Sequence, residues 1–167
     1  MLHGLPQLQK LFTVTTQFEL TDLVWEILGG FPSRYELLNT HVFRAEDLKK
    51  GFEEFLMKEL RTARTHVRNE RRSDDGLIHV FDKIKAKDTA RASDLEGIKR
   101  PTPDKLLFKD GYTIYPANAA IAFVIKHDLY KMPELPSFTE IKAVADAQRK
   151  IDKKHDTAQT QAAIKQK

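Results

Sequence analysis

Apolar residues recur at helical spacing along most of the chain, and short breaks mark where the elements end. The first helix carries its apolar residues at Leu20, Leu23, Val24, Ile27 and Leu28. Gly29 or Gly30 can take the positive φ angle that ends this helix, and Pro32 suits the first turn of a second one. Tyr35, Leu37 and Leu38 then provide the apolar side of the second helix. The pattern predicts two short helices joined by a tight corner.

A longer helix is predicted from about Ala45 to Asn69. Its buried side is marked by apolar residues at 3.6-type spacing, namely Phe52, Leu56, Leu60, Ala63 and Val67. The segment Ser73-Asp-Asp-Gly76 then forms a turn signal. We therefore expect the long helix to end before this turn.

Two short helical segments and a β-hairpin are predicted after the turn. The run from Leu77 to Ile84 suits a short helix, and the run from Ser93 to Ile98 suits a capped helical turn that ends at Gly97 or Pro101. Leu106 to Tyr115 contains β-favouring residues on both sides of Asp110-Gly111, a pair that supplies positive φ angles in a tight turn. The hairpin is the strongest local signal in the chain.

The C-terminal part contains a buried helix, a linker and a polar tail. Pro116 to Lys126 is apolar nearly all round, with Pro116 suited to the first turn of a helix. Met132-Pro-Glu-Leu-Pro-Ser137 favours an extended linker. Residues 156–167 have Ile164 as their one large aliphatic side chain, so we expect disorder or folding on binding. The predicted fold class is mostly α with one β-hairpin.

Composition limits the environment and the chemistry. The chain of 167 residues has no cysteine, which excludes disulfides and thiolate catalysis and fits a reducing compartment. The longest apolar run, residues 117–125, is too short to span a membrane, and the N-terminus has no signal-peptide pattern. We expect a cytoplasmic or nuclear protein without a membrane partner.

Positive charge is concentrated in the second half of the long helix, although the whole chain carries a net charge of only +4. The basic residues of this segment are Lys58, Arg61, Arg64, Arg68, Arg71 and Arg72. Such a stripe can bind the phosphates of nucleic acid or another polyanion. It can also face an acidic surface of a partner or domain, or water. The sequence leaves these three interpretations open.

The stretch Gly29-Gly-Phe-Pro-Ser-Arg34 resembles the turn of the helical lid that follows the nucleotide-binding core in P-loop NTPases of the AAA+ and STAND type. The resemblance implies that Gly29, Gly30 and Pro32 form a turn near bound nucleotide. It also implies that Arg34 senses the nucleotide phosphates, for which a guanidinium group is well suited. A plain corner between helices and a surface arginine are the alternatives.

Helix, helix, short helix and hairpin is the order of a winged-helix unit, which commonly follows such a lid. The expected organisation is therefore a lid-like segment (1–44), a winged-helix-like domain (45–132) and a linker with a charged, partly disordered tail (133–167). The combination is similar to NTPase modules of the Crinkler and retrotransposon hot spot type. A recognition helix would lie in residues 89–98, where Arg91 is accompanied by Asp94 and Glu96, so base reading is not favoured.

No catalytic constellation accompanies these elements. The chain lacks a Gly-x-x-x-x-Gly-Lys-Ser/Thr loop and an apolar strand ending in two acids, so ATP is expected only with a separate P-loop domain. The six histidines are dispersed, and we expect neither a metal site nor a resident cofactor. We therefore expect either a fragment of a longer protein, which is the favoured interpretation, or a chain that has lost its ATPase core. In both cases it would act as a non-catalytic regulatory or interaction region. Its partner would be an NTPase core or another protein domain, and a nucleic-acid or polyanion-binding module is the alternative.

Overall fold

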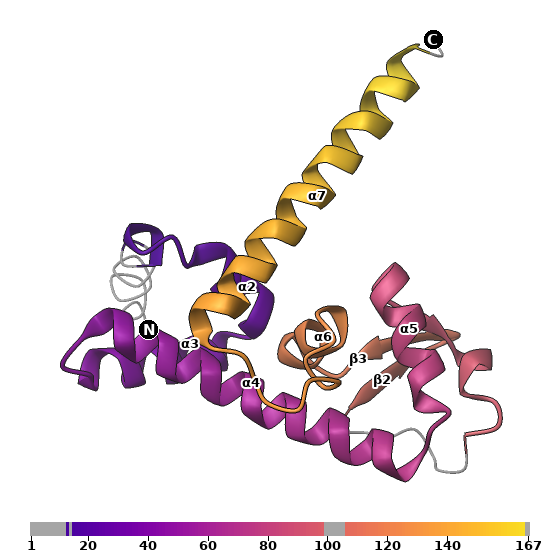
Figure 1. Cartoon of the computed structure of the whole chain (residues 1–167), viewed down its shortest axis with the longest axis horizontal. Coiled ribbons are helices and arrows are strands. Elements are labelled where there is room, and N and C mark those ends of the chain that lie inside the picture. Colours follow the sequence, from indigo (N-terminus) through magenta and orange to yellow (C-terminus); the bar gives the residue numbers. More distant parts are fainter. Residues whose placement is uncertain (1–12, 14, 99–105, 166–167) are drawn as a thin grey trace. The chain divides into compact units, whose positions relative to one another are not determined.

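A computed structural model describes residues 13, 15–98 and 106–165 of the chain (Figure 1). The chain divides into two compact units, which meet in the sequence between Leu135 and Pro136. The first unit contains every described helix and strand except the last helix. The mostly α fold with one β-hairpin is confirmed.

The corner between the first two helices forms as the sequence predicts. Helix α2 (Thr21–Leu28) buries the apolar residues expected from its spacing, and it ends at Gly29. Helix α3 (Pro32–Arg44) starts at its proline, whose missing N–H costs nothing in a first helical turn. Helices α2 and α3 belong to the same compact unit as α4, and both pack on it. The lid-like assignment of residues 1–44 stays a prediction.

Helix α4 (Leu48–Ser73) is the longest described helix of the first unit (Figure 1), and α2, α3, α5 and α6 all contact it. Asp47 caps its N-terminus by accepting a 3.0 Å hydrogen bond from the Lys50 amide. Phe52, Leu56 and Val67 on the predicted face are fully buried. Because Asp47 supplies the cap, the helix begins slightly later than the predicted Ala45, and it ends about one turn after Asn69.

Helix α5 (Leu77–Lys87) follows the predicted turn, in which the Gly76 amide donates a 2.9 Å hydrogen bond to Asp74. It buries Leu77, Phe81 and Ile84 and ends at Asp88, which adopts the left-handed conformation. The short helix expected from Leu77 to Ile84 is confirmed and extends by one turn.

Three short strands form an antiparallel sheet in the order β1-β3-β2. They are β1 (Ala90–Arg91), β2 (Leu107–Asp110) and β3 (Thr113–Pro116). Asp110 pairs with Thr113, so the two turn residues are Gly111 and Tyr112 rather than the predicted Asp110 and Gly111. Gly111 has φ +57°, and a positive φ at the first central position alone matches a type II′ turn.

The described residues between β1 and β2 contain only a 3₁₀ turn, η1 (Ala92–Leu95). The Arg91 amide donates a 2.7 Å hydrogen bond to Asp94 at this turn, and Gly97 follows it with φ +87°. The capped turn is thus confirmed, but the segment 89–98 does not form the α-helix that a winged-helix recognition element requires. Pro101 lies outside the described residues, and the winged-helix assignment stays a prediction.

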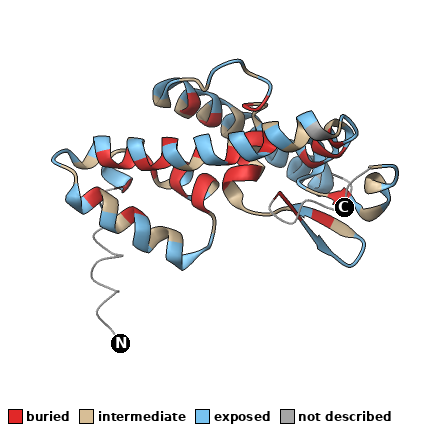
Figure 2. Ribbon diagram, turned by 90° about the horizontal axis from the view of Figure 1, so that it is seen from below, coloured by how far each residue is buried: buried red, intermediate tan, exposed pale blue. Residues whose placement is uncertain are grey.

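Helix α6 (Ala119–Lys126) supplies a large part of the core, and Phe123, Val124 and Ile125 are among its buried residues. Asn118 caps it by accepting a 2.9 Å hydrogen bond from the Ile121 amide. Pro116 ends β3 instead, so its predicted place in the first helical turn is wrong. Helices α2, α4 and α5 all contact α6, and Figure 2 shows the buried positions gathered where these helices meet.

The second unit holds one helix, α7 (Phe138–Lys165). Ser137 and Glu140 form a capping box, in which the Ser137 amide donates a 2.8 Å hydrogen bond to Glu140. The sequence predicts disorder or folding on binding for residues 156–167; the structure continues the helix to Lys165, with the side chains of residues 153–164 exposed. Within the described part of the chain, no helix has the length and apolar character needed to cross a membrane.

Candidate functional site: two cationic surfaces beside helix α4

The glycine-proline corner is held by contacts within its own chain. The Gly29 amide donates a 2.8 Å hydrogen bond to the Trp25 carbonyl, and the Tyr35 hydroxyl donates a 2.8 Å hydrogen bond to the Gly29 carbonyl. Gly29 has φ +65°. The structure therefore brings Gly29, Gly30 and Pro32 together in one turn, as the sequence predicts.

The same corner lies against helix α6. A Cβ atom added to Gly29 would stand 3.0 Å from the Cβ of Ala119, which is tighter than most real contacts. Gly29 thus meets two requirements at once, a positive φ and close approach of another helix. These packing requirements account for the glycine without any bound nucleotide.

Arg34 lies near the corner but is engaged by an acid of α4. Its Nη1 atom is 2.9 Å from Oε2 of Glu59, and the Glu59 side chain is only 16% exposed. This partner is not evident from the sequence, because the α3–α4 register cannot be read from either helix alone. A nucleotide phosphate would have to compete with Glu59 for this guanidinium group.

The predicted basic stripe on α4 separates into two groups. Arg64 points to the end of the first unit, where it donates hydrogen bonds to the carbonyls of Leu129 (2.9 Å), Met132 and Pro133 (3.0 Å). Arg68 makes a longer contact of 3.5 Å with the Pro133 carbonyl. Burial and the neighbouring Arg68 lower the pKa of Arg64, although an arginine remains charged at neutral pH. Arg64 therefore stabilises the fold.

The other group has no acidic partner within the described residues. Among the residues that the structure describes, no ion pair is formed by Lys58, Arg61, Arg71 or Arg72. Lys58, Arg61 and Arg72 are exposed, and Arg71 is partly buried. At about 100° per residue, the three exposed residues fall within about 60° of one another around the helix. We call these three residues the outer α4 face.

Acidic residues are absent from this face between its first and last members. The two acids in that interval, Glu59 and Glu70, lie roughly on the opposite side of the helix, and Glu59 is already paired with Arg34. With a rise of about 1.5 Å per residue, the outer α4 face extends over roughly 21 Å. It can therefore contact several successive phosphates of one nucleic-acid strand.

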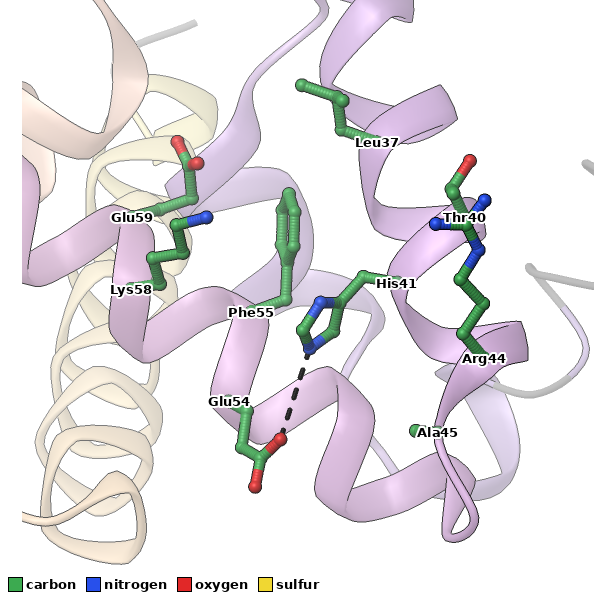
Figure 3. Close-up of a pocket in the computed structure, with 9 residues that line it drawn as sticks. All are labelled: Leu37, Thr40, His41, Arg44, Ala45, Glu54, Phe55, Lys58 and Glu59. Carbon is green, nitrogen blue, oxygen red and sulfur yellow. Dashed lines mark ion pairs between the residues drawn. The ribbon is translucent and has the colours of Figure 1, made fainter.

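A second cationic surface is a groove between α3 and α4, with a cavity volume of about 380 Å³ (Figure 3). We call it the α3–α4 groove. Phe55 is buried at its base, and the His41 ring lies 5.7 Å from the Phe55 ring. Arg44 and Lys58 supply its strong cations, so Lys58 belongs to both surfaces. No sequence motif marks the groove, because it arises from the packing of two helices.

Neither surface contains an evident set of catalytic or metal-binding groups. No cluster of three or more histidine, cysteine or acidic side chains is close enough to hold a metal ion in the described ranges. His41 and Glu54 approach each other to 4.0 Å across the groove, too far for a hydrogen bond that would activate a nucleophile. What both surfaces offer is positive charge that can bind anions.

Comparison with known proteins found no match to a protein-family model, to a curated protein or to a solved structure. The resemblance of the glycine-proline corner to an NTPase lid thus stays a prediction from the sequence. The two surfaces themselves are the basis on which a function can be proposed.

Proposed function

We propose that the chain is a binding module rather than an enzyme, and that the outer α4 face binds a polyanion, in the first instance the backbone of a nucleic acid. The observation that carries this proposal is the lack of acidic partners for Lys58, Arg61 and Arg72 among the described residues. Arg64 and Arg68 have contacts within the fold, whereas the described structure shows no contact that explains the charge of these three.

The spacing of the basic residues adds a physical argument. Arg64, Arg68 and Arg72 follow one another at intervals of four residues, and like charges at this spacing destabilise a helix. Arg61 and Arg64, three residues apart, also repel each other. A bound polyanion would relieve this repulsion, and each phosphate contact would release counterions from the nucleic acid.

The experiment measures the fluorescence anisotropy of labelled single-stranded DNA, duplex DNA and RNA with the full chain, between about 50 and 200 mM salt. The test variant combines Lys58→Ala, Arg61→Ala and Arg72→Ala. The control variant combines Lys83→Ala, Lys87→Ala and Lys153→Ala, three exposed lysines elsewhere, and has the same net charge. Binding should weaken strongly in the test variant and little in the control.

The salt dependence gives a second measure. Loss of three phosphate contacts should reduce the slope of log K against log salt by roughly 2 to 3. Absence of binding to all three probes at low salt would overturn the proposal. Equal losses of affinity in the test and control variants would show that binding depends on net charge alone and not on the outer α4 face.

A regulatory part in a P-loop NTPase-like protein is the second candidate. It is supported by the turn itself, because the lid resemblance implies that Gly29, Gly30 and Pro32 form one turn, and Gly29 ends α2 with a positive φ just before α3 starts at Pro32. The test is a titration with Mg-ATP followed by NMR. Shifts confined to the amides of Gly29, Gly30 and Arg34, and lost in Arg34→Ala, would support it. No shift at millimolar nucleotide would remove nucleotide sensing by this chain on its own.

A further inference from the structure

The acids that line the α3–α4 groove are already neutralised from outside it. Glu59 accepts the 2.9 Å ion pair from Arg34. Glu54 lies 3.9 Å from Lys50, one helical turn before it, and 4.0 Å from His41. Each carboxylate thus has a strong cation beside it that does not line the groove.

The strong cations of the groove are left without acidic partners. Arg44 stands in the last turn of α3, and Lys58 stands on α4; neither forms an ion pair with any residue that the structure describes. Figure 3 shows Lys58 and Arg44 on opposite sides of Phe55 and His41. The groove therefore presents two positive charges that flank its centre.

An apolar seat lies between these charges. Phe55 forms its base with 5% of its surface exposed, and Leu37 on α3 lines the groove with 55% exposed. A single exposed leucine is ordinary on a protein surface. Beside a partly open cavity with an aromatic base, however, it adds apolar area that a ligand can cover.

We propose that the α3–α4 groove binds an acidic segment of a partner protein, with one apolar side chain of that segment seated against Leu37 and Phe55 and its carboxylates facing Arg44 and Lys58. Because Arg44 and Lys58 flank the apolar part of the groove, a matching ligand carries negative groups on both sides of an apolar side chain. A peptide provides this alternation, whereas a nucleic-acid backbone is charged throughout and would leave the seat uncovered. The volume of about 380 Å³ suits a few side chains.

The experiment uses three fluorescein-labelled peptides of about twelve residues and the full chain. In the first peptide glutamate alternates with leucine and phenylalanine; in the second serine replaces the apolar residues; in the third lysine replaces glutamate. Fluorescence polarisation should show binding of the first peptide and roughly tenfold weaker binding of the other two.

Variants locate the binding site. Arg44→Glu and Leu37→Ser should each weaken binding of the first peptide roughly tenfold. Arg61→Glu makes the same charge reversal on α4 outside the groove, and it should change binding less than about twofold. All three residues are exposed, and unchanged circular dichroism and thermal unfolding would verify that each variant folds.

The outcomes separate this inference from the proposed function. Arg44→Glu should leave nucleic-acid binding nearly unchanged, and Arg61→Glu should weaken it. The inference is overturned if the first peptide fails to bind at about 1 mM, if it binds no better than the serine peptide, or if Arg61→Glu weakens it as much as Arg44→Glu. Each of these results leaves the nucleic-acid proposal to be judged by its own assay.

Discussion

At the scale of single residues, Gly29 meets a backbone requirement and a packing requirement at the same position. The residue type and position of Gly29 mark it as a helix end. Its close approach to Ala119, where an added Cβ would stand 3.0 Å from the alanine Cβ, depends on the packing of α2 against α6 and cannot be read from the local pattern. Arg34 shows the same limit, since its partner Glu59 lies on another helix.

Replacing Gly29 with alanine should destabilise the fold by about 2 kcal/mol, because an L-residue resists φ +65° and its methyl group would crowd Ala119. Urea unfolding of the full chain measures the change. Gly30→Ala is the control: Gly30 has no positive φ, and its added Cβ would meet only the Trp25 ring at 3.6 Å. Similar losses in the two variants would contradict this explanation of Gly29.

Replacing Arg64 with lysine should destabilise the fold by about 1 to 2 kcal/mol while preserving the charge, because an ammonium group cannot reproduce the fork that bonds several carbonyls. Hydrogen exchange should speed up at the amides near Leu129. Arg61→Lys is the matched control, since Arg61 makes no such contact in the described structure, and it should be neutral. A neutral Arg64→Lys variant would show that the carbonyl contacts contribute little.

At the scale of elements, the sequence predicts the existence of helices better than their boundaries. Hydrophobic spacing locates α4, but the capping hydrogen bond of Asp47 decides its start. The Asp110-Gly111 pair predicts a turn one residue too early, because strand register is set by pairing of Asp110 with Thr113 and not by the turn residues alone. The α3–α4 groove could not be predicted, since the sequence of either helix alone does not specify how closely and in which register the two helices pack.

Helix α5 is joined to the segment after α6 by an ion-pair network. Asp128 pairs with Lys85 and lies 3.0 Å from Lys131. Burial alone would raise the pKa of Asp128, but the hydrogen bond from Lys85 and the positive charges of Lys85 and Lys131 outweigh it and hold the pKa below its ordinary value of 3.8. A depressed carboxyl pKa stabilises the fold at pH values above the unfolded pKa. The contribution is lost as the pH falls below 3.8 and through the lower folded value.

Asp128→Asn should therefore destabilise the chain by about 1 kcal/mol at pH 7, and the difference from the original chain should disappear as Asp128 itself protonates in acid. Asparagine tolerates the left-handed backbone found at this position, so the change removes the charge with little strain. Asp88→Asn is the control, because Asp88 has the same left-handed conformation but no ion pair in the described structure. Chemical unfolding at several pH values measures this difference in stability. A loss of stability that does not depend on pH would contradict the role of the Asp128 charge.

At the scale of the whole molecule, the sequence marks the break before the last helix, whereas the contacts that join the preceding helices come only from the structure. The prolines of residues 132–137 predict a break, and the two compact units divide between Leu135 and Pro136. The boundary expected after residue 44 rests on the lid resemblance, and local patterns do not reveal that α2 packs on both α4 and α6. The long-range contacts of the core, rather than the glycine and proline turn signals in the sequence, determine which elements belong to one unit.

This division predicts how the chain responds to truncation. A chain that ends at Leu135 keeps the carbonyls bound by Arg64 and the buried side chains of Leu129 and Tyr130, so it should retain cooperative urea unfolding. A chain that ends at Lys126 loses all of these contacts and should lose several kcal/mol, enough to abolish the transition in a domain of ordinary stability. Unfolding of both truncated chains, followed by circular dichroism, tests the boundary. If the chain ending at Leu135 also lacked a cooperative transition, α7 would be required for the first unit to fold.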